Sequence, residues 1–312
     1  MKILLTGACG FIGSHLCRAF IERGYKVIGV DNLITSSRDN LRDIIKNKNF
    51  LFIEHDISKE LYVADKIDWV MHFASPASPP DYSRYPIKTL KVGSLGTLNC
   101  LGIAKAKKAK FFLASTSEVY GDPQVRPQPE EYWGNVNPIG LRSCYDESKR
   151  LAEALTFAYH RQHKVNIRII RIFNTYGPFM RADDGRVVSN FINQALEGKD
   201  LTIYGQGEQT RSFCYIDDLV RGILGLMEVE YQLPLNLGNP SEVKVVDLAR
   251  KIIKMTRSSS TIKYLPLPQD DPKRRCPDIK KAKKVLGWKP KVSLSEGLKK
   301  TIEYFRNLKH SA

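Results

Sequence analysis

A tyrosine and a lysine four residues apart, in the run SCYDESKR, form a pair that could perform acid–base chemistry. Tyr145 and Lys149 open a helix predicted over residues 145–163, so both side chains share one helix face. Tyrosine has a reference pKa of about 10 and is a poor base at neutral pH. Because a neighbouring ammonium favours the phenolate, we expect Lys149 to lower the pKa of Tyr145. The pair could then take the proton of a substrate hydroxyl while its carbon is oxidised.

Three further polar residues follow an apolar strand in the run LASTSEVYGDP. Thr116 and Ser117 carry hydroxyls and Glu118 carries a carboxylate, where a buried strand ends. We expect Thr116 to hydrogen-bond the same substrate oxygen as Tyr145. We expect Glu118 to face the substrate, where burial and a like charge would raise its pKa, so that it holds a proton near neutrality. The alternative is a carboxylate that only caps the loop.

A glycine motif joins the first predicted strand to the first helix. Gly7, Gly10 and Gly13 would allow a tight turn and a close approach of the backbone to a pyrophosphate, on the helix N-terminus. The motif alone is a weak signal, but Asp31 ends the next strand, where a carboxylate binds a ribose 2′-hydroxyl and repels a 2′-phosphate. We therefore predict NAD rather than NADP. Asp56 ends the third strand and is either a contact to the adenine or a turn-forming aspartate.

The elements that must position these residues alternate between strand and helix. Strands are predicted over 2–7, 25–31, 49–56, 67–75, 109–116 and 165–174, with helices over 11–24, 86–107 and 145–163. This order predicts an α/β fold, a Rossmann-type doubly wound parallel sheet. Beyond residue 177 the pattern is mixed, with many Pro and Gly. We therefore expect an NAD-binding, catalytic domain over 1–176 and a smaller mixed α/β substrate lobe over 177–312, with the chain crossing between the two.

Composition narrows the class of protein. The chain has 312 residues and a net charge of +16. Residues 241–312 hold 19 Lys or Arg against 7 Asp or Glu, so 12 of these net charges lie near the C-terminus. No nucleic-acid-binding motif accompanies them, and nucleic acid is an unfavoured partner. No apolar run could span a membrane. The six scattered cysteines suggest reduced thiols in the cytoplasm, and no metal site is predicted.

Longer runs of sequence show a resemblance. "ASPASPP", "NPIGLRSCYDESKR", "DGRVVSNFI" and "LTIYGQGEQTRSFCYIDDLV" make the chain similar, nearly end to end, to extended short-chain dehydrogenases/reductases that act on nucleotide sugars. Within these it resembles the UDP-glucuronate decarboxylases. The resemblance implies decarboxylation of UDP-glucuronate to UDP-xylose through a UDP-4-keto intermediate, with NAD recycled internally. It also implies a homodimer, packed through the helices predicted over 86–107 and 145–163.

The resemblance also implies site residues. The catalytic set would be Thr116, Ser117, Glu118, Tyr145 and Lys149. The NAD set would be Gly7, Gly10, Phe11, Ile12, Gly13, Asp31, Asn32, Thr35, Asp56, Ile57, Phe73, Ala74 and Ser75, with Tyr145 and Lys149. The substrate set would be Lys91, Glu118, Asn174, Arg186, Tyr204, Arg211 and Arg275, with Tyr204 near the uracil. Arginine forks suit a diphosphate.

Departures from the family pattern and rival functions remain open. Ser36 stands where the family usually has glycine, Gly93 where asparagine is usual, and Ser148 where glycine is usual. A UDP-sugar 4-epimerase would share the cofactor and the Tyr145–Lys149 pair. A 4,6-dehydratase would too, but it needs an acid where this chain has Ser117. A non-catalytic NAD-binding or RNA-associated relative would need none of the catalytic residues.

Overall fold

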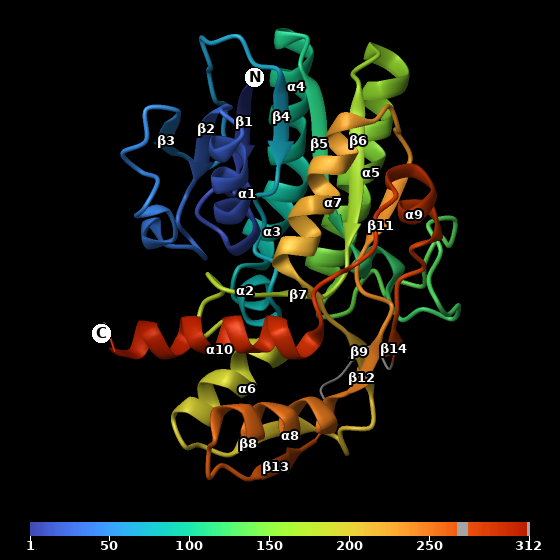
Figure 1. Cartoon of the computed structure of the whole chain (residues 1–312). Coiled ribbons are helices and arrows are strands. Elements are labelled where there is room, and N and C mark those ends of the chain that lie inside the picture. The colour runs from blue at the N-terminus through green and yellow to red at the C-terminus, as the bar shows by residue number, and fades with distance from the viewer. Residues whose placement is uncertain (267–273, 311–312) are drawn as a thin grey trace.

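The computed structural model describes residues 1–266 and 274–310, and its centre is a seven-stranded parallel sheet. The strand order is β11-β6-β5-β4-β1-β2-β3 (Figure 1). The strands are β1 (Lys2–Thr6), β2 (Lys26–Asp31), β3 (Phe50–Glu54), β4 (Trp69–His72), β5 (Lys110–Thr116), β6 (Ile167–Ile172) and β11 (Pro234–Leu237). The order reverses beside β1, and in sheets of this kind ligands bind at the carboxyl edge near such a reversal.

Two helical layers cover the sheet, which confirms the predicted Rossmann-type α/β fold. Helices α1 (Phe11–Glu22) and α7 (Ile216–Glu228) pack together on one face. Helices α3 (Pro86–Lys91), α4 (Thr97–Lys107) and α5 (Ser143–His163) cover the other face (Figure 1). Short helical segments α2 (Pro79–Arg84), η1 (Arg38–Leu41) and η3 (Ser117–Tyr120) lie in the connecting loops.

Alternation along the strands separates the core into two layers. Ile3 and Leu5 of β1 face the cluster that contains α1 and α7, whereas Leu4 between them faces the cluster under α4 and α5. All three side chains are fully buried. The continuous apolar run of such strands therefore follows from burial on both faces of the sheet.

The helix predicted over residues 86–107 is confirmed, since the chain is helical from Pro86 to Lys107. It contains a π-helical turn, Val92–Gly96, between α3 and α4, which the sequence did not predict. A Cβ placed on Gly93 would lie 2.6 Å from the Cβ of Ser148 on α5, closer than real side chains approach. The π turn thus lies where the two helix backbones meet most closely, and it lies opposite the helix that carries Tyr145.

A smaller lobe lies below the carboxyl edge of the sheet (Figure 1). Its helices are α6 (Val187–Leu196), α8 (Val245–Thr256) and α10 (Leu294–His310), whereas α9 (Lys280–Leu286) packs beside β11 and α7 at the edge of the main sheet. Its strands are β7 (Thr175–Tyr176), β8 (Leu201–Tyr204), β9 (Thr210–Ser212), β10 (Cys214–Tyr215), β12 (Glu242–Lys244), β13 (Ile262–Leu265) and β14 (Arg274–Arg275). Because β11 returns to the main sheet, the chain crosses between the two parts, and a division at residue 176 stays a prediction.

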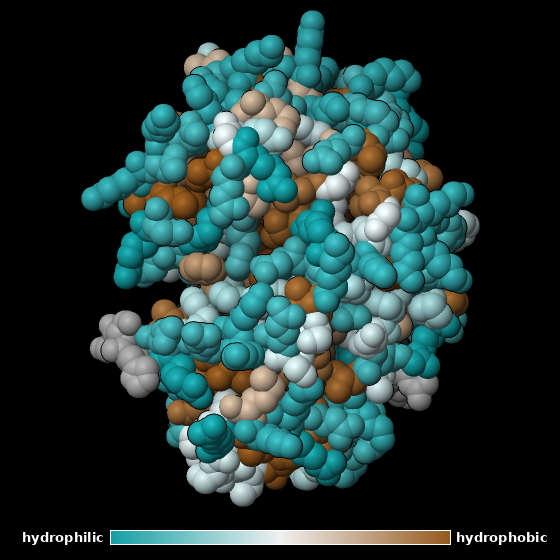
Figure 2. All heavy atoms as spheres, in the orientation of Figure 1, coloured by the Kyte–Doolittle hydropathy of each residue, from teal (hydrophilic) through white to brown (hydrophobic). Residues whose placement is uncertain are grey.

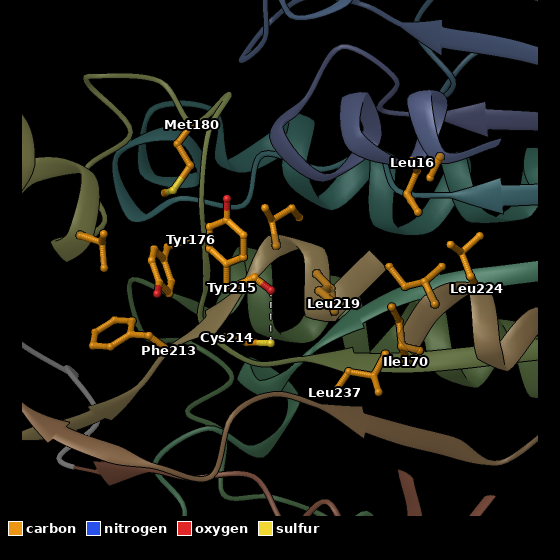
Figure 3. Packing of buried hydrophobic residues seen from close by; sticks show 14 of the residues in the cluster. Leu16, Ile170, Tyr176, Met180, Phe213, Cys214, Tyr215, Leu219, Leu224 and Leu237 are labelled. Carbon is orange, nitrogen blue, oxygen red and sulfur yellow. Dashed lines mark hydrogen bonds between the residues drawn. The ribbon is translucent and has the colours of Figure 1, made fainter. Parts of the chain in front are cut away.

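An apolar junction joins the two parts. Figure 3 shows Tyr176, Phe213 and Tyr215 gathered beside α7. The ring of Tyr176 meets those of Phe213 and Tyr215 edge to face, at centroid distances of 6.3 and 5.6 Å.

On the face of the molecule shown in Figure 2, hydrophilic residues predominate. No helix within residues 1–266 and 274–310 is long and apolar enough to cross a membrane.

Candidate active site

A cavity of about 660 Å³ lies where the carboxyl edge of the sheet faces the smaller lobe. The sequence-predicted residues that line it are Gly7, Gly10, Phe11, Ile12, Gly13, Thr35, Phe73, Ser75, Thr116, Ser117, Glu118, Tyr145, Lys149, Asn174, Arg186, Tyr204, Arg211 and Arg275. The structure thus brings the two chemistry-bearing runs, the glycine motif and the second-lobe arginines around one space. This volume is within the usual range for small-molecule sites.

The glycine turn forms a cradle that only glycine can form. Gly7 has a φ of +73°, and a Cβ there would lie 2.8 Å from the backbone nitrogen of Ala74. A Cβ on Gly13 would lie 1.9 Å from the carbonyl oxygen of Gly7. Gly10 caps α1 without a side-chain hydrogen bond, and the first turn has no acidic residue. The open N–H groups and the helix dipole at this end fit the pyrophosphate of a dinucleotide such as NAD.

Asp31 anchors the loop beside this cradle. Its carboxylate accepts hydrogen bonds from the backbone N–H of Cys9 and of Leu33 and from the Ser36 hydroxyl, each at 2.9 Å. Ser36, a departure from the family pattern, thus adds a bond that glycine could not make. Each carboxylate oxygen can accept further bonds, so the predicted contact with a ribose hydroxyl stays open.

Six sequence-predicted residues are not among those that line the cavity in the described chain. They are Asp31, Asn32, Asp56, Ile57, Ala74 and Lys91. Asp56 accepts hydrogen bonds from the backbone N–H of Ser58 at 3.0 Å and from its hydroxyl at 2.8 Å, which is the turn-forming role. Ile57 is buried in the core under α4, and Lys91 is exposed at the end of α3.

The Tyr145–Lys149 pair is buried at the N-terminal end of α5. The Lys149 ammonium donates to the carbonyl oxygen of Ala114 at 2.9 Å and lies 5.9 Å from the centroid of the Tyr145 ring. Thr116 is hydrogen-bonded to Tyr145, and a bond from Thr116 to a substrate oxygen stays a prediction. Tyr82 of α2 stacks on Tyr145 with ring centroids 5.3 Å apart and an interplanar angle of 8°. Sequence reasoning missed Tyr82, although it ends the motif PASPPDY.

The expectation that Lys149 lowers the pKa of Tyr145 is wrong for this arrangement. Burial raises the pKa of Tyr145 to about 12, although the hydrogen bond from Thr116 opposes the shift. Burial likewise lowers the pKa of Lys149 to about 8, with Glu153 opposing. Loss of solvation outweighs the mutual effect of the pair, because both groups lie in the interior. A phenolate would need a further positive charge beside the ring.

Glu118 lies between two arginines. Nη2 of Arg142 donates to Oε2 of Glu118 at 2.6 Å, and Nη1 of Arg275 donates to Oε1. Arg275 is 4% exposed and also donates to the carbonyl oxygen of Gly121 at 3.0 Å. Arg142 was not predicted as a site residue. It lies next to the tyrosine motif in the sequence, but nothing there indicates that it reaches Glu118.

The expected raised pKa of Glu118 is also wrong. Burial alone would raise it, but Arg275 and Arg142 outweigh burial and lower the pKa of Glu118 to about 2. The raised pKa belongs instead to Asp146, next to Tyr145. Burial and the charge of Glu118 raise the pKa of Asp146 to about 7, and its Oδ1 is buried without a hydrogen-bond partner among the described residues. A protonated carboxyl near neutrality is therefore present, but it is not the one predicted.

Second-lobe residues approach the other end of the cavity. Arg211 on β9 and Arg275 on β14 are direct neighbours across a parallel strand pair. Arg211 donates to the carbonyl oxygen of Thr210 at 3.0 Å. Arg186, whose charge acts on Tyr145, donates through Nε to Oδ1 of Asp184 at 2.5 Å. Tyr204 is 46% exposed, as suits a residue at the mouth of the cavity.

Comparisons with known proteins agree with this site. The model of the NAD dependent epimerase/dehydratase family matches residues 3–238. The chain is 54% identical over 312 residues to UDP-glucuronic acid decarboxylase 1 of Xenopus tropicalis, covering 100% of this chain and 74% of that protein. It is 54% identical over 307 residues to UDP-glucuronic acid decarboxylase 6 of Arabidopsis thaliana, covering 98% and 89%. The crystal structure of UDP-glucuronic acid 4-epimerase from Bacillus cereus, in complex with UDP-glucuronic acid and NAD, superposes with a TM-score of 0.89 at 33% identity, covering 99% and 100%.

Proposed function

The chain belongs to the NAD dependent epimerase/dehydratase family, and we propose that it is a carboxy-lyase that converts UDP-glucuronate to UDP-xylose and CO2. Relatives that are 51–54% identical over 98–100% of this chain are UDP-glucuronic acid decarboxylases, which supports this substrate and product. The observation that carries the proposal is the Arg142–Glu118–Arg275 cluster beside Tyr145. A decarboxylase and an epimerase of UDP-glucuronate both bind the carboxylate on C5, but only the decarboxylase breaks the bond from C5 to it, so charged groups that orient this carboxylate have a chemical role there.

The charges of this cluster suit that carboxylate. Two guanidinium groups share one ionised carboxylate, so the cluster keeps one net positive charge beside the cavity. A substrate carboxylate could pair with that charge, and charge-assisted bonds of this kind are the stronger ones. Because its pKa is about 2, Glu118 is ionised and orients the two arginines, and it does not carry a proton in this arrangement.

The chemistry follows from the groups around the C4 hydroxyl. Tyr145, with Thr116 beside it, is placed to take the proton of that hydroxyl and later return it. NAD, when bound, supplies the oxidation of C4 and its reversal. A ketone at C4 is β to the carboxylate, so the bond from C5 to the carboxylate carbon can break with its electrons in an enolate. In this proposal Ser117, which lines the cavity and is 2% exposed, holds a water that brings a proton to C5.

Identification of the products tests the proposal. Purified protein incubated with UDP-glucuronate is expected to yield UDP-xylose and one CO2 per turnover without accumulation of NADH, as followed by proton NMR and absorbance. UDP-galacturonate as the only product would establish epimerisation and contradict the proposal. No turnover with NAD present would favour the non-catalytic relative.

A homodimer and a cytoplasmic location are part of the same proposal. Ile87 and Leu90 of α3, Leu95 of the π turn and Leu151 of α5 are 63%, 40%, 45% and 45% exposed. These apolar side chains lie on helices that pack side by side, so together they form a face suited to a second copy of the chain.

The six cysteines are all free and buried, which supports a reducing compartment such as the cytoplasm.

A further inference from the structure

Residues 178–181, which we call the strap, run from the sheet side of the cavity to the smaller lobe and are tied to the cofactor-binding half. Nε2 of His15 on α1 lies 3.0 Å from the carbonyl oxygen of Pro178. The Arg18 guanidinium lies 4.1 Å from the centroid of the Phe179 ring, and Asn40 donates to the carbonyl oxygen of Phe179 at 3.4 Å. One side of the strap is therefore fixed to α1 and η1, which follow the glycine turn and Asp31 in the sequence.

The last residue of the strap, Arg181, joins three separate segments. Its Nη1 donates to the carbonyl oxygen of Thr35 at 2.8 Å, in the loop that Asp31 anchors. Its Nη2 donates to Oδ1 of Asp81 on α2 at 2.9 Å, and its Nε donates to Oδ1 of Asp183 at 3.0 Å. Thr35, Asp81 and Arg181 all line the cavity that contains Tyr145. A single guanidinium group thus connects the loop that Asp31 anchors, α2 and the smaller lobe across that cavity.

Two features of the backbone show that the strap is held under constraint. Phe179 has a φ of +68°, a left-handed conformation that is unusual for an aromatic residue and persists only where its surroundings impose it. Gly185, four residues after the strap, lies so close to α2 that a Cβ there would be 2.3 Å from Cγ of Pro80. The segment that follows the strap is therefore packed directly against α2. Loss of the bonds of Arg181 would therefore favour movement of the strap away from the cavity.

We propose that the strap retains NAD and that Arg181 is its latch, a positioning residue that slows the release of the cofactor without touching the reacting sugar. This inference rests on the proposed function, in which one NAD serves both redox steps and must stay bound between them. The side chain of Arg181 is 28% exposed, so water can compete for its bonds, and the latch can open. Asp81 is 13% exposed, so its side of the contact stays in place.

The release rate of NAD tests the latch. Holoenzyme loaded with radiolabelled NAD is chased with unlabelled NAD, and the label that stays with the protein is followed over time. Arg181→Met and Asp81→Asn are each expected to speed release about tenfold or more, since the first removes the bonds of the guanidinium group and the second removes the charge of its carboxylate partner. The double variant should release NAD no faster than Arg181→Met, because both changes break the same contact. Arg250→Met, which breaks an exposed Arg–Asp pair on α8, is the matched control and should match the parent.

A second readout separates the latch from the chemistry. During turnover of UDP-glucuronate, the latch variants are expected to accumulate NADH, seen as absorbance, together with free UDP-4-keto sugar. Asp81→Asn keeps the shape of the side chain, so it tests the proposal even if Arg181→Met fails to fold. Release rates within twofold of the parent in a folded latch variant would overturn the inference, whereas absence of NAD binding or of CO2 formation in the parent would overturn the proposed function instead.

Discussion

At the scale of single residues, Glu118 acquires a role that differs from the expected one. Its two arginine partners hold it ionised, so its contribution is to orient charge rather than to store a proton. Arg142 comes from the start of α5, and Arg275 lies 157 residues away along the chain. Removal of the carboxylate charge would leave two guanidinium groups facing one another, and the cluster would no longer keep its geometry.

Glu118→Gln is therefore expected to lower turnover about 10²-fold, the scale of a misplaced reacting group, while NAD affinity stays close to that of the parent. The physical reason is the loss of the charge that orients Arg142 and Arg275 beside C5. Single-turnover measurement of NADH absorbance alongside CO2 release checks this. Glu131→Gln, at an exposed glutamate paired with Lys281, is the matched control. If both signals in Glu118→Gln proceed within a few-fold of the parent, Glu118 is only scaffolding.

Asp146 offers a test through stability. Its pKa is raised to about 7 by burial and by Glu118, so between about pH 4 and pH 7 the folded state binds more protons than the unfolded state does. Stability therefore falls as pH rises through that window. Asp146→Asn removes the penalty and should be more stable than the parent above pH 7 by on the order of 4 kcal/mol, since the pKa rises from 3.8 to about 7 and each unit corresponds to about 1.36 kcal/mol.

Denaturant unfolding of the parent and of Asp146→Asn at pH 5 and pH 8.5 checks the direction of this pH dependence. The advantage of Asp146→Asn should grow from the lower to the higher pH, because the parent carboxyl must ionise while buried. An advantage that does not change with pH would show that Asp146 does not titrate in this window.

At the scale of elements, two departures from the family pattern meet in space. Gly93 lies in the π turn and Ser148 lies on α5, and a Cβ on Gly93 would approach the Cβ of Ser148 to 2.6 Å. The Ser148 hydroxyl donates a hydrogen bond to the carbonyl oxygen of Tyr145 at 2.7 Å. The contact between Gly93 and Ser148 therefore lies next to the Tyr145–Lys149 pair. A small residue at one position thus makes room for the larger one at the other, and the helix that carries Tyr145 keeps its place.

Gly93→Asn is expected to destabilise the protein by about 1–3 kcal/mol, the usual cost of overpacking. Adding Ser148→Gly removes the Cβ and Oγ of residue 148, whereas its carbonyl oxygen at 2.9 Å stays, so the double variant should regain part of that loss. Chemical denaturation of the parent, both single variants and the double variant gives the coupling energy. Strictly additive effects would mean that the two positions do not share one space.

At the scale of the whole molecule, the exposed apolar face on α3, the π turn and α5 lies on the opposite side of these helices from the sheet. Helices buried on both sides would position Tyr145 more firmly than helices open to water on one side. Ile87→Glu combined with Leu95→Glu is expected to give a monomer, because charges placed in an apolar interface must be desolvated. Light scattering after gel filtration measures the mass.

The control for this change is Leu233→Glu, at a leucine that is 55% exposed but precedes β11, away from the proposed face. It should leave the oligomeric state unchanged. A parent protein that is already monomeric at micromolar concentration would contradict the homodimer.

Sequence alone determined the parts of this protein that depend on local order. Alternating strands and helices fix a doubly wound sheet, because parallel strands need crossovers of one hand. Glycines at 7 and 13 fix the cradle, because a Cβ at either position would strike the backbone. The four-residue spacing of Tyr145 and Lys149 places them together for the same local reason.

Only the tertiary structure decided the charges of the site. The pKa of Glu118 depends on Arg275, which sequence proximity cannot reveal, and the pKa of Tyr145 depends on how deeply the fold buries it. The contact between Gly93 and Ser148 and the bridge made by Arg181 likewise join segments far apart in the chain. Electrostatic and packing energies depend on distance in space, and a sequence pattern specifies distance only within a helix, a strand or a turn.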